Sequence, residues 1–192
     1  IEIVYREFNL DVFNKDNENF EYNIVPKVQH INYLNKIIEF NGLSIGNICI
    51  DKYVEAKLNS LIDKYGEGEL KVNIKIDEEF SSEFDAYELN IDKEINIVAV
   101  NNDAAYYALL TLEQILSQIE SDKLLRKLEI HDFANQKIRG VIEGYYGIPW
   151  GNKKRADIMK FTSKFKGNVF IFAPKDDPYH RDKWYELYPK EE

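Results

Sequence analysis

One segment near the end of the chain constrains the fold more than any other. Residues 137–143 read as a strand, residues 152–166 as a helix and residues 168–173 as a second strand. A strand, a crossover helix and a following strand form a parallel βαβ unit. The second strand carries Ile171, Phe172 and Ala173 without polar alternation, which is typical of a strand covered on both faces. We therefore predict the first βαβ portion of a (β/α)8 barrel, with its working groups in the loops that follow the strands.

The preceding sequence predicts a small α/β sheet domain. Apolar positions at helical spacing indicate a helix over 51–65, with Asp51 and Gly66 at its ends, and a second over 102–119, capped by Asp103. The expected strands cover residues 1–5, 22–28, 68–77 and 128–133, a weaker candidate at 36–40, and a hairpin formed by 86–91 and 94–100. We expect the two helices to cover one face of the sheet.

A short polar connection near Ala134-Asn-Gln136 separates the two patterns. The chain is accordingly divided into an N-terminal α/β domain, residues 1–135, and the truncated start of a barrel, residues 136–192. A complete barrel needs about 250 residues, so two parallel strands alone would leave open edges and uncovered apolar surface. We expect this surface either to pack onto the first domain or to associate with a second copy of the chain.

Composition argues against several kinds of partner. The formal net charge of −9 disfavours nucleic acid, because phosphate binding needs a positive face. No run of about 18 apolar residues is present, so no membrane span is expected, and no signal peptide is visible. The single cysteine, Cys49, excludes an intrachain disulfide, and its apolar neighbours Ile48 and Ile50 predict a buried thiol. The basic run at 153–155 is interpreted as a solvated surface.

Two loops carry residues suited to a ligand. The first predicted barrel strand leads into Gly144 and the second into Lys175, and both loops open at the same end of a parallel unit. A glycine lets a ligand approach the backbone closely, and a lysine ammonium offers N–H donors to the hydroxyl oxygens of a sugar. Gly144 alone could be a tight turn, and Lys175 alone could form an ion pair with Asp176 or Asp177. Together, at two adjacent strand ends, they favour a binding role.

The motifs around these two residues are specific. The stretches Arg139-Gly-Val-Ile-Glu-Gly-Tyr-Tyr-Gly-Ile-Pro-Trp150 and Phe172-Ala-Pro-Lys-Asp-Asp-Pro-Tyr-His-Arg181 closely resemble the opening of the catalytic barrel of glycoside hydrolase family 84. That family contains O-GlcNAc-removing β-N-acetylglucosaminidases and bacterial enzymes named hyaluronidases. The resemblance covers roughly residues 80–192 and is loose in the N-terminal third.

The resemblance implies a glycosidase that removes β-linked N-acetylglucosamine from a glycan by substrate-assisted, retaining hydrolysis. Gly144 and Lys175 match the positions that bind hydroxyls of the sugar ring. The catalytic aspartate pair of the family follows a later barrel strand, so no catalytic residue is assigned in this chain, and the 192 residues alone are expected to be inactive. The resemblance also implies an extracellular, secreted protein and no cofactor.

Other candidates in these loops are set aside. Asp176 and Asp177 match the second binding motif and not the catalytic one, so they are expected to hold Lys175 and its loop instead of acting as the general acid. His180 beside these aspartates could suggest a metal site, but three side chains in one short loop rarely close a coordination sphere, and no metal is expected. Tyr145, Tyr146 and Trp150 could border the sugar pocket, but packing under the barrel mouth is the favoured interpretation.

Two alternatives are left open. A non-catalytic carbohydrate-binding or interaction module would also lack an acid pair. A related hexosaminidase family could share the leading domain and use a different acid pair, although the loop Ala173-Pro-Lys-Asp-Asp177 argues against it.

Overall fold

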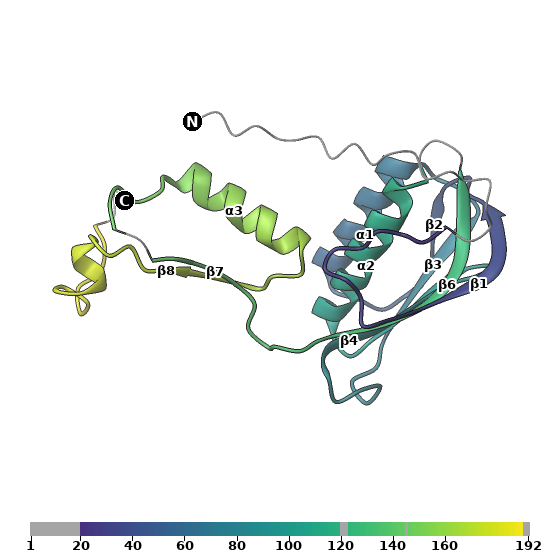
Figure 1. Ribbon diagram of the computed structural model, residues 1–192, viewed down its shortest axis with the longest axis horizontal. Helices are drawn as coiled ribbons and strands as arrows, with labels where there is room; N and C mark the ends of the chain where they lie inside the picture. Colours follow the sequence, from purple (N-terminus) through teal and green to yellow (C-terminus); the bar gives the residue numbers. More distant parts are fainter. Residues whose placement is uncertain (1–19, 120–122, 145, 190–192) are drawn as a thin grey trace.

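The computed structural model describes residues 20–119, 123–144 and 146–189, whose strands form two sheets (Figure 1). The larger sheet has six strands in the order β1-β6-β4-β5-β3-β2. These strands are β1 (His30–Glu39), β2 (Leu43–Ile48), β3 (Leu70–Ile76), β4 (Phe84–Ile91), β5 (Ile95–Ala99) and β6 (Leu124–Ala134). The neighbours β2, β3 and β5 run parallel, whereas β4 and β6 pair antiparallel with their neighbours.

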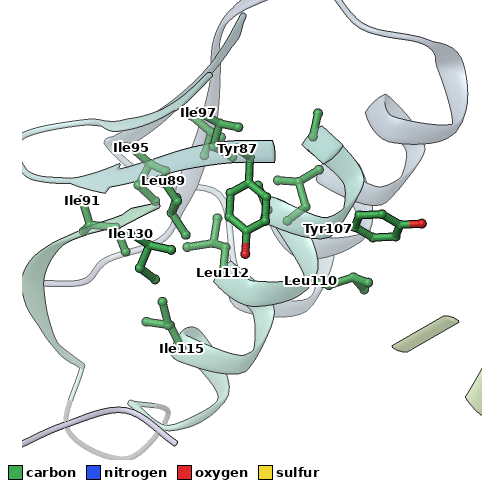
Figure 2. Packing of buried hydrophobic residues seen from close by; sticks show 14 of the residues in the cluster. Tyr87, Leu89, Ile91, Ile95, Ile97, Tyr107, Leu110, Leu112, Ile115 and Ile130 are labelled. Carbon is green, nitrogen blue, oxygen red and sulfur yellow. The ribbon is translucent and has the colours of Figure 1, made fainter. Parts of the chain in front are cut away.

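Two helices, α1 (Lys52–Tyr65) and α2 (Asn102–Ser117), lie side by side on one face of this sheet (Figure 1). Apolar residues of the strands meet apolar residues of α2 in the space between the layers, as Leu89, Ile97, Leu112 and Ile115 show (Figure 2). All four are fully or almost fully buried, and burying a side chain of this size stabilises a fold by about 1.5–3 kcal/mol. The predicted α/β layer with its helices on one face is confirmed.

The helix ends agree with the sequence only in part. Gly66 ends α1 with a φ of 96°, a conformation that favours glycine. The N-cap of α2 is Asn101 and not Asp103, because the Asn101 side chain accepts the hydrogen bond from the Ala104 backbone N–H. Asp103 instead accepts a hydrogen bond of 2.7 Å from the Tyr53 hydroxyl, which joins the two helices.

Asp51 precedes α1 at the expected position, but its side chain makes no capping hydrogen bond. The expected strands at 36–40 and 128–133 are parts of the longer strands β1 and β6, and the expected hairpin is formed by β4 and β5. The expected strand at 1–5 lies outside the described residues. Cys49 is exposed and not buried, because it follows the edge strand β2 where the sheet ends.

The prediction of a strand over 22–28 is wrong, because this segment pairs with side chains of α2. Proline lacks a backbone donor, so Pro26 disfavours a continuous sheet ladder here. The backbone N–H groups of Asn23 and Val25 instead donate to the side-chain oxygens of Gln118 and Gln114, both at 2.8 Å. The same two glutamines donate back to the carbonyls of Asn23 and Val25. Tyr22, Ile24 and Val28 are therefore buried without belonging to a strand.

The second sheet pairs β7 (Gly140–Glu143) with β8 (Val169–Phe172) in parallel, and α3 (Asn152–Lys164) connects them. This is the predicted βαβ unit. A Cβ atom on Gly140 would lie 1.7 Å from the carbonyl oxygen of Val169, so only glycine allows this approach of the two strands. The start of β8 is held by Asn168, whose side-chain oxygen accepts a 2.9 Å hydrogen bond from the Arg139 backbone N–H.

We predict that Gly140→Ala separates β7 from β8. The added methyl group collides with backbone that has no flexible end to move away. Hydrogen exchange of the β8 amides should then be faster by about tenfold or more, whereas exchange in the six-stranded sheet is unchanged. Gly151→Ala is the matched control, because no atom lies within 4 Å of its added Cβ. Equal protection of β8 in both variants would contradict this account.

A second prediction concerns alkaline pH. Burial raises the pKa of the Tyr87 hydroxyl well above its usual value of 10.0, and the nearby Asp132 carboxylate raises it further. Because the phenol ionises more easily in the unfolded chain, its stabilising contribution is complete below pH 10 and is lost as the pH rises beyond that value. The free energy of unfolding in urea should therefore fall above about pH 10, and less steeply in Tyr87→Phe. Tyr146→Phe changes an exposed ring and should keep the full slope.

Candidate active site

The parallel pairing of β7 and β8 places Gly144 and Lys175 beyond the same end of the small sheet. The register pairs Gly140 with Val169 and Glu143 with Phe172, and the Ala173 N–H extends it by donating to the Glu143 carbonyl at 3.1 Å. Gly144 comes directly after β7, and Lys175 lies in the turn after β8. The described geometry thus brings both predicted residues to one rim.

The two faces of the small sheet differ. Glu143 faces α3, where it pairs with Arg155, and the Arg155 guanidinium carbon lies 4.4 Å from the centre of the Phe172 ring. Side chains alternate along a strand, so Ile142 and Ile171 point to the opposite face. They are 63% and 42% exposed, which leaves that face open.

Gly144 belongs to the open face. A Cβ atom built on Gly144 would meet only the Ile142 side chain, at 3.1 Å. The backbone of Gly144 does not itself demand glycine, because its φ lies outside the left-handed region. The missing side chain therefore leaves space beside Ile142, where a ligand could approach the main chain.

The aspartates next to Lys175 hold the rim loops. Asp176 accepts a 2.7 Å hydrogen bond from the Gly147 backbone N–H, which links the loop after β8 to the loop after β7. Asp177 caps the short helix η1 (Pro178–His180) by accepting from the Tyr179 N–H at 2.8 Å, and it also accepts from the Tyr188 hydroxyl. Both carboxylates thus have structural partners, as expected for residues that hold the loop.

One part of that expectation is wrong. Within the described residues, neither Asp176 nor Asp177 forms an ion pair with Lys175. The Lys175 side chain is half-buried at the rim. Its ammonium is consequently not committed to the aspartates of its own loop.

The sequence analysis missed the pair formed by Glu143 and Arg155. Glu143 is fully buried and accepts hydrogen bonds from Arg155 Nε at 2.7 Å, from Arg155 Nη2 at 3.1 Å and from the Trp150 N–H at 2.9 Å. Arg155 is therefore not part of a solvated basic surface. The available signal was a carboxylate at the end of the apolar run Val141-Ile142, since a buried charge requires a partner. This pair fixes the loop after β7 against α3.

A hollow lies on the α3 side of the small sheet. It measures about 930 Å³, and Trp150, Arg155, Phe172 and Tyr179 are among its lining residues. Neither Gly144 nor Lys175 lines it. In a closed barrel, helices cover this side of the strands, so we place the candidate site on the opposite face and not in this hollow.

Two further findings concern metals and membranes. Among the described residues, no three His, Cys, Asp or Glu side chains are grouped so that they could hold a metal ion. Every helix that the structure describes is too short or too polar to cross a bilayer.

Comparison with known proteins gives matches for both parts of the chain. Residues 139–192 match the family model described as beta-N-acetylglucosaminidase, and residues 21–133 match the one described as glycosyl hydrolase family 20, domain 2. Protein O-GlcNAcase from Rattus norvegicus is 41% identical over 59 residues, which are 31% of this chain and 6% of that protein.

Solved structures agree with these matches. CpGH84D has a TM-score of 0.77 and 32% sequence identity, over 90% of this chain and 34% of that chain. The GH20 exo-β-N-acetylglucosaminidase from Vibrio harveyi, solved with N-acetylglucosamine, has a TM-score of 0.60 and 18% identity over 78% of this chain and 25% of that chain, which shows a shared fold alone. This chain therefore spans about a third or less of these proteins.

The leading domain is matched by a family 20 domain model from residue 21 onward, and the comparisons do not favour a non-catalytic module. The leading domain is of a type shared with family 20, as the alternative of a related hexosaminidase family supposed, but the segment after it matches the β-N-acetylglucosaminidase model. The chain therefore belongs, through residues 21–133, to the glycosyl hydrolase family 20 domain 2 family, and together with the segment that follows it resembles the N-terminal portion of family 84 β-N-acetylglucosaminidases.

Proposed function

We propose that this chain contributes to a glycosidase that removes β-linked N-acetylglucosamine from glycans, and that Gly144 and Lys175 bind the sugar. The observation that carries the proposal is the position of these two residues at one rim of two directly paired parallel strands. Gly144 offers open space beside its backbone, and Lys175 offers an ammonium with several N–H donors. These groups are complementary to the hydroxyl oxygens of a pyranose ring.

The chemistry proposed for the whole protein is substrate-assisted hydrolysis with retention. The 2-acetamido oxygen of the sugar attacks the anomeric carbon, one carboxylate polarises the acetamido group, and a second acid protonates the leaving oxygen. Asp176 and Asp177 accept hydrogen bonds from Gly147, Tyr179 and Tyr188, which supports a structural role for them. The acid pair is therefore proposed to come from residues outside this sequence.

The open face of the small sheet supports a larger barrel in the whole protein. Ile142 and Ile171 are apolar and exposed on the side that faces the interior of a (β/α)8 barrel. In the isolated chain, the same surface favours association with a second copy. An extracellular location and a bacterial source stay predictions from the sequence resemblance.

Lys175→Met tests the sugar-binding role in a longer protein that carries the complete barrel. Losing a hydrogen bond from a charged group costs about 1.5–3 kcal/mol, so kcat/KM for an aryl β-N-acetylglucosaminide should fall by about 10–100-fold. Lys160→Met removes an exposed lysine of α3 and should leave kcat/KM unchanged. Equal activity of the two variants would remove Lys175 from the site.

The 192-residue chain provides a second test. We expect it to hydrolyse no aryl β-N-acetylglucosaminide, because both aspartates of the rim have structural hydrogen bonds. Activity in this chain that is lost in Asp176→Asn or Asp177→Asn would contradict the assignment and would identify the acid within the rim loop.

A further inference from the structure

A buried charge joins the small sheet to the six-stranded domain. Lys166 follows α3 with a φ of 61°, in the left-handed region, and the residue is only 8% exposed. Its Nζ donates to Asp132 Oδ2 at 2.7 Å and to the Tyr87 hydroxyl at 2.9 Å. A non-glycine residue adopts such a backbone conformation where its surroundings hold it there. The side chain of Lys166 thus reaches from the turn before β8 into the first domain.

The acceptors of Lys166 are themselves fixed. Tyr87 on β4 and Asp132 on β6 are directly opposite each other in the antiparallel ladder. The Tyr87 hydroxyl lies 2.9 Å from Asp132 Oδ2 and 2.7 Å from Thr111 Oγ1 of α2, and its ring enters the core from β4 (Figure 2). Asp132 Oδ1 accepts a further hydrogen bond from the Gln29 N–H at 3.1 Å. A continuous set of polar contacts therefore runs from α2 through β4 and β6 to the turn before β8.

A second charge holds the other strand. Arg139 stands directly before β7, and its Nη2 donates to Asp85 Oδ2 at 2.8 Å. Its Nε donates to the Lys166 carbonyl at 3.0 Å, and its guanidinium carbon lies 5.4 Å from the centre of the Tyr107 ring. Arg139 and Lys166 thus hold β7 and β8 at their N-terminal ends, opposite to the rim with Gly144 and Lys175.

The small sheet depends on such contacts. A two-stranded sheet is marginal in water, and the two strands of this sheet have no further neighbour among the described residues. A buried ion pair contributes little to net stability compared with apolar packing, because both ions are desolvated, but it accepts only a narrow range of geometries. Burial lowers the pKa of Lys166 and the Asp132 carboxylate opposes this effect. The pair is thus better suited to fixing a position than to adding stability.

We infer that Lys166, through Asp132 and Tyr87, is a positioning residue for the sugar site. Contacts with the six-stranded domain fix the position of β8. The position of β8 in turn fixes where Lys175 meets the sugar. The link to the sugar rests on the proposed function, whereas the contact between the sheets does not.

The first test uses the chain itself. Lys166→Met removes the ammonium and keeps a long side chain, and Lys164→Met, two residues earlier and exposed, is the matched control. Exchange of the β8 amides should be faster by about tenfold or more in Lys166→Met and unchanged in Lys164→Met, with the six-stranded sheet fully protected in both. Unchanged protection of β8 in Lys166→Met would overturn the inference.

A lone buried carboxylate could also unfold the first domain. The double variant Asp132→Asn/Lys166→Met removes both charges and leaves an amide whose oxygen can accept from the Gln29 N–H while its NH2 group donates to the Tyr87 hydroxyl. The circular dichroism spectrum of this variant should show that the six-stranded sheet remains folded. The β8 amides should exchange as fast as they do in Lys166→Met. Protection of β8 equal to that of the unmodified chain would overturn the inference here as well.

The second test uses the longer protein and separates positioning from general stability. A displaced Lys175 weakens sugar binding, so Lys166→Met should raise KM for an aryl β-N-acetylglucosaminide by about 5–20-fold and change kcat by less than about twofold. Lys166→Arg keeps the charge and should restore at least about half of the lost kcat/KM. A fall in kcat at constant KM would overturn the positioning role. If the unmodified protein hydrolyses no such substrate, the proposed function fails, and the exchange measurements alone decide on the contact between the sheets.

Discussion

A buried ion must have a partner, and this requirement determines how the two parts of the chain meet. The ammonium of Lys166 is removed from water by the first domain, and the carboxylate of Asp132 and the hydroxyl of Tyr87 supply the partners. The Tyr87 ring lies in the core between the six-stranded sheet and α2, and its hydroxyl contacts Thr111 of α2. The short parallel sheet thus takes its position from contacts with the six-stranded domain.

The two ends of the short strands have different roles. Arg139 and Lys166 occupy the ends that face the first domain, where they hold the strands. Gly144 and Lys175 occupy the opposite rim, where Asp176 ties the two loops together and the open face begins. Such a separation suits the binding role that we propose for Gly144 and Lys175, because other residues hold the strands, as is usual for parallel barrels.

The sequence predicted the elements whose signals are local. The apolar stripes of α1 and α2, the hairpin of β4 and β5, and the βαβ unit all follow from periodicity. The positions of Gly144 and Lys175 at one rim followed from the sequence motifs and from the parallel topology of the two strands. The errors came from contacts between residues that are separated in the sequence. The main chain at 22–28 pairs with the side chains of Gln114 and Gln118 instead of with a strand. Arg155, which was expected on a solvated surface, pairs with the buried Glu143. No signal in the sequence indicated the role of Asp132, because its partner Lys166 is remote in the sequence and lies beside it only in the folded chain.

The two glutamines of α2 have a consequence for sequence variation. Each primary amide offers one acceptor and one donor to the same main-chain unit, and so imitates a peptide group. A carboxylate at either site would lose the donor, and an ammonium would lose the acceptor. Asparagine would keep the amide donor and acceptor, but on a side chain that is one methylene group shorter. Positions 114 and 118 are thus surface sites at which the side-chain chemistry is as restricted as in a hydrophobic core.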